Sequence, residues 1–224
     1  MDKYVINMSQ KTSILLILTL FLLMGMSACS SLASNPGGAP GSVLFQDDFD
    51  VTPKGWGTMD RNGGEIAFNY GGLVIKVNLA DFMFWTVHGD EFTDSRIDVD
   101  AVLMDGPAND NFGVLCRYQD NQNFYGFLVT HDGYYGIFKM QDGNFVLSSE
   151  KDDLQYSEAI RQGGVVNHIT AVCQGSELRL IVNETLLAEI ADDSFSQGQV
   201  GLIAGAYDQP GVQILFDNFV VTQP

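Results

Sequence analysis

The side chains whose types suggest ligand chemistry lie near the middle of the chain. Arg117, Tyr125 and Lys139 are spaced so that three consecutive antiparallel strands would align them in one row. Trp85 and Tyr135 are candidate neighbours of that row. Aromatic faces stack on the C–H faces of pyranose rings and charged groups bond sugar hydroxyls, so the row is a candidate sugar-binding surface. The alternative is that Tyr125 packs beneath two surface cations.

The segment that must position these residues is Phe112–Met140, FGVLCRYQDNQNFYGFLVTHDGYYGIFKM. Its β-branched and aromatic runs favour strands. Two loops rich in Asn, Asp and Gly, Gln119–Asn123 and His131–Gly133, interrupt them, because these residues tolerate positive φ. The segment therefore predicts a three-stranded meander at the centre of a sheet.

The pairing register of the meander follows from its loops. If Tyr118 pairs with Phe124, Arg117 lies opposite Tyr125, which in turn lies opposite Lys139. The core face then carries Phe112, Val114, Cys116, Tyr118, Phe124, Leu128, Tyr134, Phe138 and Met140. The opposite face carries Leu115, Phe127, Val129 and Ile137 before it becomes polar at the row. A slip of one residue would exchange the two faces.

Composition indicates β-structure and excludes nucleic acid as a partner. The chain of 224 residues has 24 Gly, 15 Phe and 8 Tyr, and its net charge is −17. That charge repels phosphate backbones. About twelve to fourteen short strands separated by turn signals predict a two-sheet antiparallel sandwich in one domain, residues 43–224.

The beginning of the chain has the features of a targeting segment. Lys3 and Lys11 precede the apolar run Ile14–Met24, which is too short to span a membrane comfortably. Met26-Ser27-Ala28-Cys29 resembles the lipobox of bacterial lipoproteins. The resemblance implies a signal peptide at residues 1–28, acylation of Cys29, and a lipid-anchored, extracytoplasmic protein in the cell envelope. Residues 29–42 would be a flexible tether. The alternative is an ordinary signal peptide with an incidental cysteine.

Two further cysteines, Cys116 and Cys173, lie in separate predicted strands. In an exported domain a disulfide is the favoured interpretation, with two buried thiols as the alternative. The bond would close a loop of about 57 residues and stabilise the domain by roughly 4 kcal/mol in the chain-entropy model.

Several motifs together resemble the concanavalin A-like lectin/glucanase superfamily, in its laminin-G-like branch. They are DDFD near the first strand, CRYQD…NFYGF…DGYYGI in the middle, LRLIVNETLLAEI, and the closing GQVGLIAGAYDQPGVQILFDNFVV. The resemblance covers Val43–Val221 and implies a two-sheet antiparallel jelly-roll sandwich. It identifies function poorly, because that fold hosts lectins, glycanases and adhesion modules.

The resemblance also raises an enzymatic alternative. Glucanases of this superfamily carry Glu-x-Asp-x-Glu on one strand face, and two close carboxylates are what a retaining mechanism needs. Here Arg96, Asp98 and Asp100 occupy a comparable alternation. Arg96 cannot act as a nucleophile, so Asp98 and Asp100 are the alternative catalytic pair, and a solvated strand face with an Arg–Asp pair is the simpler interpretation.

No cofactor is indicated with certainty, although the resemblance implies a structural Ca²⁺. Asp48 in the first strand region and Asp217 in the last would supply carboxylates for it. His88, His131 and His168 lack zinc-ligand spacing.

Non-catalytic binding of a glycan or another surface ligand is the function that these observations favour. A glycoside hydrolase of the same fold and a structural or adhesion module that binds protein are the alternatives. The membrane would be contacted through the lipid anchor only, and the sequence does not fix the oligomeric state.

Overall fold

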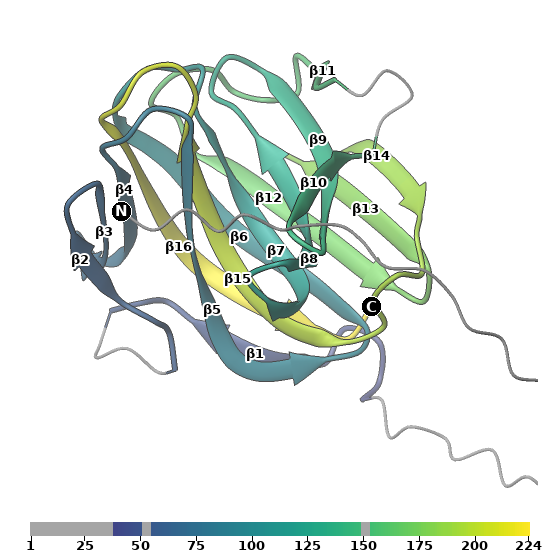
Figure 1. Ribbon diagram of the computed structural model, residues 1–224. Coiled ribbons are helices and arrows are strands. Elements are labelled where there is room, and N and C mark those ends of the chain that lie inside the picture. The colour runs from purple at the N-terminus through teal and green to yellow at the C-terminus, as the bar shows by residue number, and fades with distance from the viewer. Residues whose placement is uncertain (1–37, 51–54, 149–152) are drawn as a thin grey trace, which may run out of the picture. The chain divides into compact units, whose positions relative to one another are not determined.

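The computed structural model describes residues 38–50, 55–148 and 153–224 (Figure 1). The predicted signal peptide, Cys29 and most of the predicted tether lie outside the described residues. All described residues belong to one unit, Pro36–Pro224. They contain only strands, turns and loops, so this part of the chain has no helix that could cross a membrane.

The larger sheet is nine-stranded. Its strands follow the order β14 (Thr185–Ala191), β13 (Glu177–Val182), β12 (Asn167–Gln174), β6 (Ser95–Asp105), β16 (Val212–Thr222), β4 (Gly72–Val77), β3 (Gly64–Asn69) and β2 (Met59–Arg61), and β1 (Val43–Asp47) also pairs with β16.

The smaller sheet is seven-stranded and contains the central meander. Its order is β10 (Asn144–Leu147), β9 (Tyr134–Gln141), β8 (Asn123–Val129), β7 (Asn111–Asp120), β15 (Gly198–Ala206) and β5 (Phe82–Phe92), and β11 (Gln155–Tyr156) pairs with β9. All strand pairs are antiparallel in both sheets, which confirms the predicted two-sheet jelly-roll sandwich.

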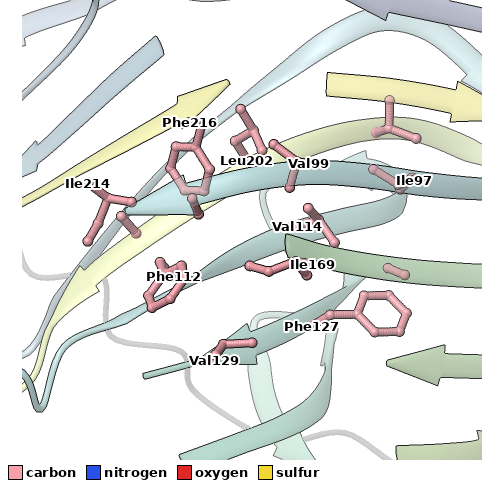
Figure 2. Packing of buried hydrophobic residues seen from close by; sticks show 14 of the residues in the cluster. Ile97, Val99, Phe112, Val114, Phe127, Val129, Ile169, Leu202, Ile214 and Phe216 are labelled. Carbon is pink, nitrogen blue, oxygen red and sulfur yellow. The ribbon is translucent and has the colours of Figure 1, made fainter. Parts of the chain in front are cut away.

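The main core lies between the two sheets and follows from the alternation of side chains along each strand. In β6, Ile97 and Val99 are fully buried, whereas Asp98 between them points away from the core. Figure 2 shows these residues packed with Phe112 and Val114 of β7 from the facing sheet. Burial of this apolar surface is the main force that holds the sheets together.

The disulfide is present between Cys116 of β7 and Cys173 of β12, so it joins the two sheets through the core. Both cysteines are fully buried. The prediction of a disulfide in place of two free thiols is therefore confirmed.

The second hairpin of the meander has the predicted register, but the first hairpin does not. Tyr125 lies opposite Lys139, as expected. Opposite Tyr125 on β7, however, lies Cys116 and not Arg117. Phe112, Val114 and Cys116 of β7 lie in the main core as predicted, but the faces predicted for β8 and β9 are exchanged. The main core contains Phe127, Val129 and Ile137, and the opposite face of the sheet carries Phe124, Leu128 and Phe138.

The cause of this shift is a β-bulge in β7. Leu115 pairs with Gly201 and Tyr118 with Gln199, so two residues of β7 oppose one residue of β15. Arg117 has a φ of 50°, in the left-handed region that a non-glycine residue rarely adopts. The bulge turns the Arg117 side chain inward and returns Tyr118 to the outer face of the sheet, where it packs with Phe124.

Candidate functional site

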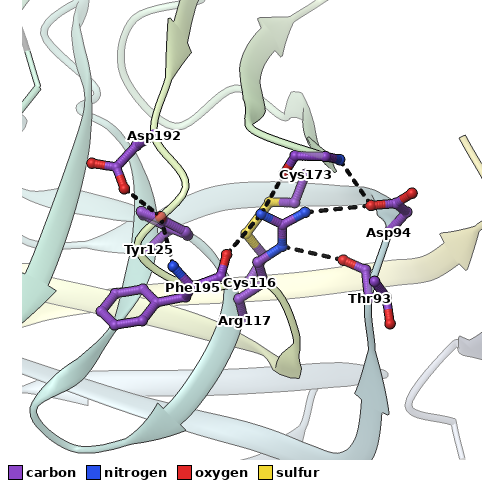
Figure 3. The surroundings of a disulfide bond; sticks show 9 residues. Thr93, Asp94, Cys116, Arg117, Tyr125, Cys173, Asp192 and Phe195 are labelled. Atoms are coloured by element: carbon purple, nitrogen blue, oxygen red, sulfur yellow. Dashed lines mark hydrogen bonds and ion pairs between the residues drawn. A yellow bond between two sulfur atoms is a disulfide. The ribbon is translucent and has the colours of Figure 1, made fainter. Parts of the chain in front are cut away.

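The Arg117 side chain is buried and closes one end of the sandwich. It is 2% exposed. Its Nη1 donates to the carbonyls of Gly175 (2.7 Å) and Phe195 (2.8 Å), and its Nε donates to the carbonyl of Thr93 (3.1 Å). The Asp94 carboxylate lies 3.4 Å from Nη2 and neutralises the charge (Figure 3). Arg117 therefore ties three loops together and has no side-chain atoms free for a ligand.

Tyr125 and Lys139 hold the segment between β14 and β15. The Tyr125 hydroxyl donates to Asp192 at 2.5 Å and accepts from the Phe195 amide at 3.1 Å (Figure 3). Lys139 Nζ donates to the other Asp192 oxygen at 2.6 Å. Burial, reinforced by the bond to Asp192, raises the pKa of Tyr125 to about 12.

The expected open row of Arg117, Tyr125 and Lys139 is therefore corrected: the row is internal. Tyr125 is 1% exposed because the residues 192–195 cover it. Tyr135 is 8% exposed and belongs to the main core. Trp85 is separated from the other four residues, because it lies on the opposite face of the seven-stranded sheet.

That opposite face carries a second apolar cluster, rich in aromatic side chains. We call it the aromatic face; its aromatic members are Trp85, Tyr118, Phe124, Phe138 and Phe145. Phe124 is fully buried at the centre, with ring centroids 5.6 Å from Trp85, 5.5 Å from Tyr118 and 5.8 Å from Phe138. Phe138 in turn stacks on Phe145 at 4.6 Å. Trp85 and Tyr118 are thus partly exposed, and both pack against the buried ring of Phe124.

Polar groups lie beside the aromatic face at the end of the β7–β8 hairpin. The Tyr118 hydroxyl donates to the Asn121 side chain at 2.7 Å. The Asp120 carboxylate accepts bonds from the Gln122 amide (2.7 Å) and the Asn123 side chain (3.0 Å). Asp120, Asn121 and Gln122 are exposed, so accessible amide and carboxylate groups lie at the Tyr118 end of the aromatic face.

Tyr118 is the site residue that sequence reasoning assigned to the wrong environment. It was expected on the core face, and the bulge at Arg117 places it on the outer face instead. The one signal in the sequence was the polar loop that follows it, which marks the surface end of the hairpin.

A pocket of about 480 Å³ lies elsewhere on the same face, where β5, β7, β8, β10 and β15 meet. It is lined by Asp81, Phe82, Met83, Asn111, Leu128, Phe145, Leu147, Asp153, Leu154, Ala206 and Tyr207. Gly205 makes room for the Asn111 amide, because a Cβ there would lie 2.5 Å from Asn111 Oδ1.

The alternative catalytic residues, Asp98 and Asp100, lie on the outer face of the other sheet and form an ion-pair network. Arg96 donates two bonds of 2.8 Å to Asp98. His168 Nδ1 lies 2.7 Å from Asp100, and its Nε2 lies 3.5 Å from Asp98. The expected Arg–Asp pair on this strand is present.

The pKa values of this network oppose acid catalysis. Hydrogen bonds to Asp98 and Asp100 outweigh burial and raise the pKa of His168 to about 9. Burial alone would raise the pKa of Asp98, but bonds from His168, Arg96 and Thr170 lower it to about 2. A general acid must be protonated near its working pH, so Asp98 is unsuited to that role.

Asp48 and Asp217, the expected calcium ligands, lie near each other where β1 meets β16. Burial, together with the charges of Asp50, Asp100 and Asp48, raises the pKa of Asp217. Within residues 38–50, 55–148 and 153–224, no three acidic, histidine or cysteine side chains converge as a metal site. Asp48 and Asp217 alone supply fewer than the six to eight oxygen ligands that Ca²⁺ takes, which also include carbonyl and water oxygens.

His131 has a structural role. It is fully buried, its Nδ1 is 2.9 Å from Asp110, and its Nε2 accepts from the Leu103 amide at 3.0 Å. Since Nε2 is an acceptor, the proton is on Nδ1. Both ring nitrogens are used, and the residue binds the β8–β9 turn to β6.

Known proteins resemble this chain in structure and not in sequence. No family model and no curated protein matches it. Among solved structures, the carbohydrate-binding module CBM66 from Bacillus subtilis matches with a TM-score of 0.62 and 19% identity, covering 75% of this chain and 96% of the module.

Two further structures show the range of proteins with this fold. A protein of unknown function with a galectin-like fold from Bacillus subtilis has a TM-score of 0.58 and 13% identity, over 82% of this chain and 97% of that one. A GH43 protein from Bacillus licheniformis has a TM-score of 0.61 and 15% identity, over 80% of this chain and 39% of that one. At these identities the similarity establishes the fold alone.

The strand topology and these neighbours define the class of the domain: a jelly-roll-like antiparallel β-sandwich, related to the concanavalin A-like class. The carbohydrate-binding module shares this architecture over nearly its whole length, whereas the GH43 protein shares it over 39% of its chain.

Proposed function

We propose that the domain binds a glycan, without catalysis, on the aromatic face of the seven-stranded sheet. The observation that carries the proposal is the pair of partly exposed rings, Trp85 and Tyr118, which both pack against Phe124, with the exposed Asn121 amide bonded to the Tyr118 hydroxyl. Rings fixed by packing lose little entropy when a pyranose stacks on them, and side-chain amides both donate to and accept from its hydroxyls.

Oligosaccharide binding by the folded domain tests this proposal. We expect an array of neutral oligosaccharides to retain the wild-type domain, and Trp85→Ala and Tyr118→Ala each to weaken binding by about tenfold or more. Tyr70→Ala is the matched control, because Tyr70 is 63% exposed and lies on a turn of the other sheet. Failure of the wild type to bind any oligosaccharide, or equal binding by all three variants, would refute the proposal.

We further propose that acylated Cys29 anchors this domain outside the cytoplasmic membrane. The lipobox-like Met26–Cys29 run and the inter-sheet disulfide, which suits an oxidising compartment, support this location. Expression in a bacterial host with a labelled fatty acid should label the wild type and leave Cys29→Ala unlabelled. Mass spectrometry that finds Cys29 unmodified and residues 1–28 retained would overturn the proposal.

The two alternatives give different results in simple assays. Release of reducing sugar that is lost in Asp98→Asn and Asp100→Asn would favour a glycoside hydrolase. Binding that survives in Trp85→Ala and requires a protein partner would favour an adhesion module. The low pKa of Asp98 argues against the enzyme, since this carboxylate is not set up as a proton donor.

A further inference from the structure

The pocket where β5 meets β15 has mainly apolar walls. Its lining includes Leu128, Leu147, Leu154 and Met83. None of these four side chains carries a group that hydrogen-bonds well to a sugar hydroxyl. A bare hexose in this pocket would leave several hydroxyls without hydrogen bonds, and each unpaired hydroxyl weakens binding. The pocket chemistry is therefore different from that of the Trp85–Tyr118 region.

Three of the residues that line the pocket are large, exposed aromatic side chains. Phe82 is 49% exposed, Phe145 is 47% exposed and Tyr207 is 66% exposed. Three large exposed hydrophobic side chains around one cavity of about 480 Å³ form a concave apolar site of the size that small ligands occupy. An aliphatic chain would cover these rings and the walls behind them together.

The polar groups of the pocket select the charge of the ligand. Asp81 is acidic, and none of the described residues that line the pocket is a lysine or an arginine. The Oδ1 atom of Asn111, which also lines the pocket, is buried and accepts no hydrogen bond from the described residues. The Asp81 carboxylate repels an anionic head group and can accept hydrogen bonds from hydroxyl or ammonium groups.

We propose that this pocket binds the alkyl or acyl chain of an amphiphile whose head group is neutral or cationic. The chain packs against Leu128, Leu147 and Met83, and the head lies at the mouth beside Asp81. This site goes beyond the proposed glycan binding, because Trp85 and Tyr118 do not line the pocket.

A chain-length series measured by titration calorimetry tests the proposal. The probes are alkyl maltosides with chains of increasing length, each below its critical micelle concentration, with maltose as the ligand without a chain. Each methylene that the pocket buries should strengthen binding about fourfold, until the chain exceeds the pocket and affinity levels off. Maltosides that bind no tighter than maltose would overturn the proposal. So would affinity that keeps rising with chain length, since that indicates adsorption to a surface.

Head-group selectivity is the second arm. Alkyl sulfates should bind at least tenfold more weakly than maltosides of the same chain length, and alkyltrimethylammonium ions at least as tightly as the maltosides. Asp81→Asn should reduce the difference in affinity between alkyl sulfates and alkyl maltosides, because it removes one repelling charge. Asparagine is chosen because its side chain tolerates the φ of 58° at this position. Equal binding of sulfates and maltosides by the wild type would contradict the assignment.

Exposed wall residues provide variants that do not perturb the core. Phe82→Ser with Tyr207→Ser should reduce alkyl maltoside affinity by at least tenfold. The matched control, Tyr70→Ser with Leu186→Ser, removes two exposed apolar side chains elsewhere and should leave affinity unchanged. Equal losses of alkyl maltoside affinity in the two double variants would refute binding in this pocket.

Different results would refute the proposal of glycan binding on the aromatic face and the proposal of chain binding in the pocket. Trp85→Ala should abolish binding of unmodified oligosaccharides and leave the chain-length dependence of alkyl maltosides intact. Conversely, a domain that binds no oligosaccharide and still shows a chain-length plateau refutes glycan binding and supports the pocket.

Discussion

At the scale of single residues, several charged side chains of this acidic domain form hydrogen bonds and ion pairs that hold neighbouring strands and loops together. Arg117 binds three loop carbonyls, Lys139 binds Asp192, and His168 is held between two carboxylates. These contacts are on strands whose neighbours are fixed by the sheet, so the partners are already oriented. Their contributions can be tested residue by residue.

The His168 ion pairs should make stability depend on pH on the alkaline side. In the unfolded chain histidine titrates near pH 6.5, whereas the pKa of folded His168 is about 9. Its contribution is therefore fully present below pH 6.5 and is lost as the pH rises through about 9. Urea unfolding between these pH values should show a decline in the wild type that is smaller in His168→Gln.

Thr170→Val is the control for this experiment. It removes the hydrogen bond of 2.6 Å from the uncharged Thr170 hydroxyl to Asp98 and keeps the His168 pairs, so the decline in stability at alkaline pH should persist in this variant. Identical pH profiles for the wild type and His168→Gln would show that the network does not contribute to stability.

Arg117→Lys should be destabilising even though the charge is kept. The guanidinium bonds the Thr93 carbonyl through Nε and the Gly175 and Phe195 carbonyls through Nη1, whereas lysine has a single nitrogen that cannot occupy both positions, and buried acceptors left unpaired are costly. We expect the free energy of unfolding in urea to fall by about 3 kcal/mol. The exposed Arg61→Lys is the control. A loss below about 1 kcal/mol would contradict the role assigned to Arg117.

At the scale of elements, one bulged strand decides which residues reach the surface. The sequence predicted the meander, its two loops and the register of the second hairpin, because Asn, Asp and Gly mark turns and strand residues alternate. It did not predict the bulge, since the left-handed φ of Arg117 is favoured only by the three carbonyls that distant loops bring to its guanidinium. The candidate row was consequently misplaced, and Trp85 alone of its five residues remains on an accessible face.

The disulfide is the covalent link between the two sheets. Its sequence separation of 57 residues predicts that Cys116→Ala with Cys173→Ala loses roughly 4 kcal/mol of unfolding free energy in the chain-entropy model. Urea unfolding of the oxidised wild type and the double variant measures this difference. Reduced wild type should unfold at a similar urea concentration to the variant. Unfolding transitions that coincide with and without the bond would refute a stabilising role.

At the scale of the whole molecule, the net charge of −17 should bias the choice of ligand. A protein with this charge repels uronate-rich and sulfated oligosaccharides, and salt screens the repulsion. Binding of neutral oligosaccharides should be nearly independent of salt, whereas binding of anionic oligosaccharides should be weak at low salt and increase at high salt. Anionic oligosaccharides that bind more tightly at low salt would contradict this expectation.

The amino-acid pattern by itself determined the class of fold, the disulfide and the acidic surface. These depend on local propensities, strand alternation and composition, which are properties of the chain read in order. Only the tertiary structure decided that Arg117 and Tyr125 are internal, that Tyr118 joins Trp85 on the aromatic face, and that an apolar pocket opens beside Asp81. Each of these depends on segments far apart in sequence meeting across a sheet, where a shift of one residue moves a side chain from one face to the other.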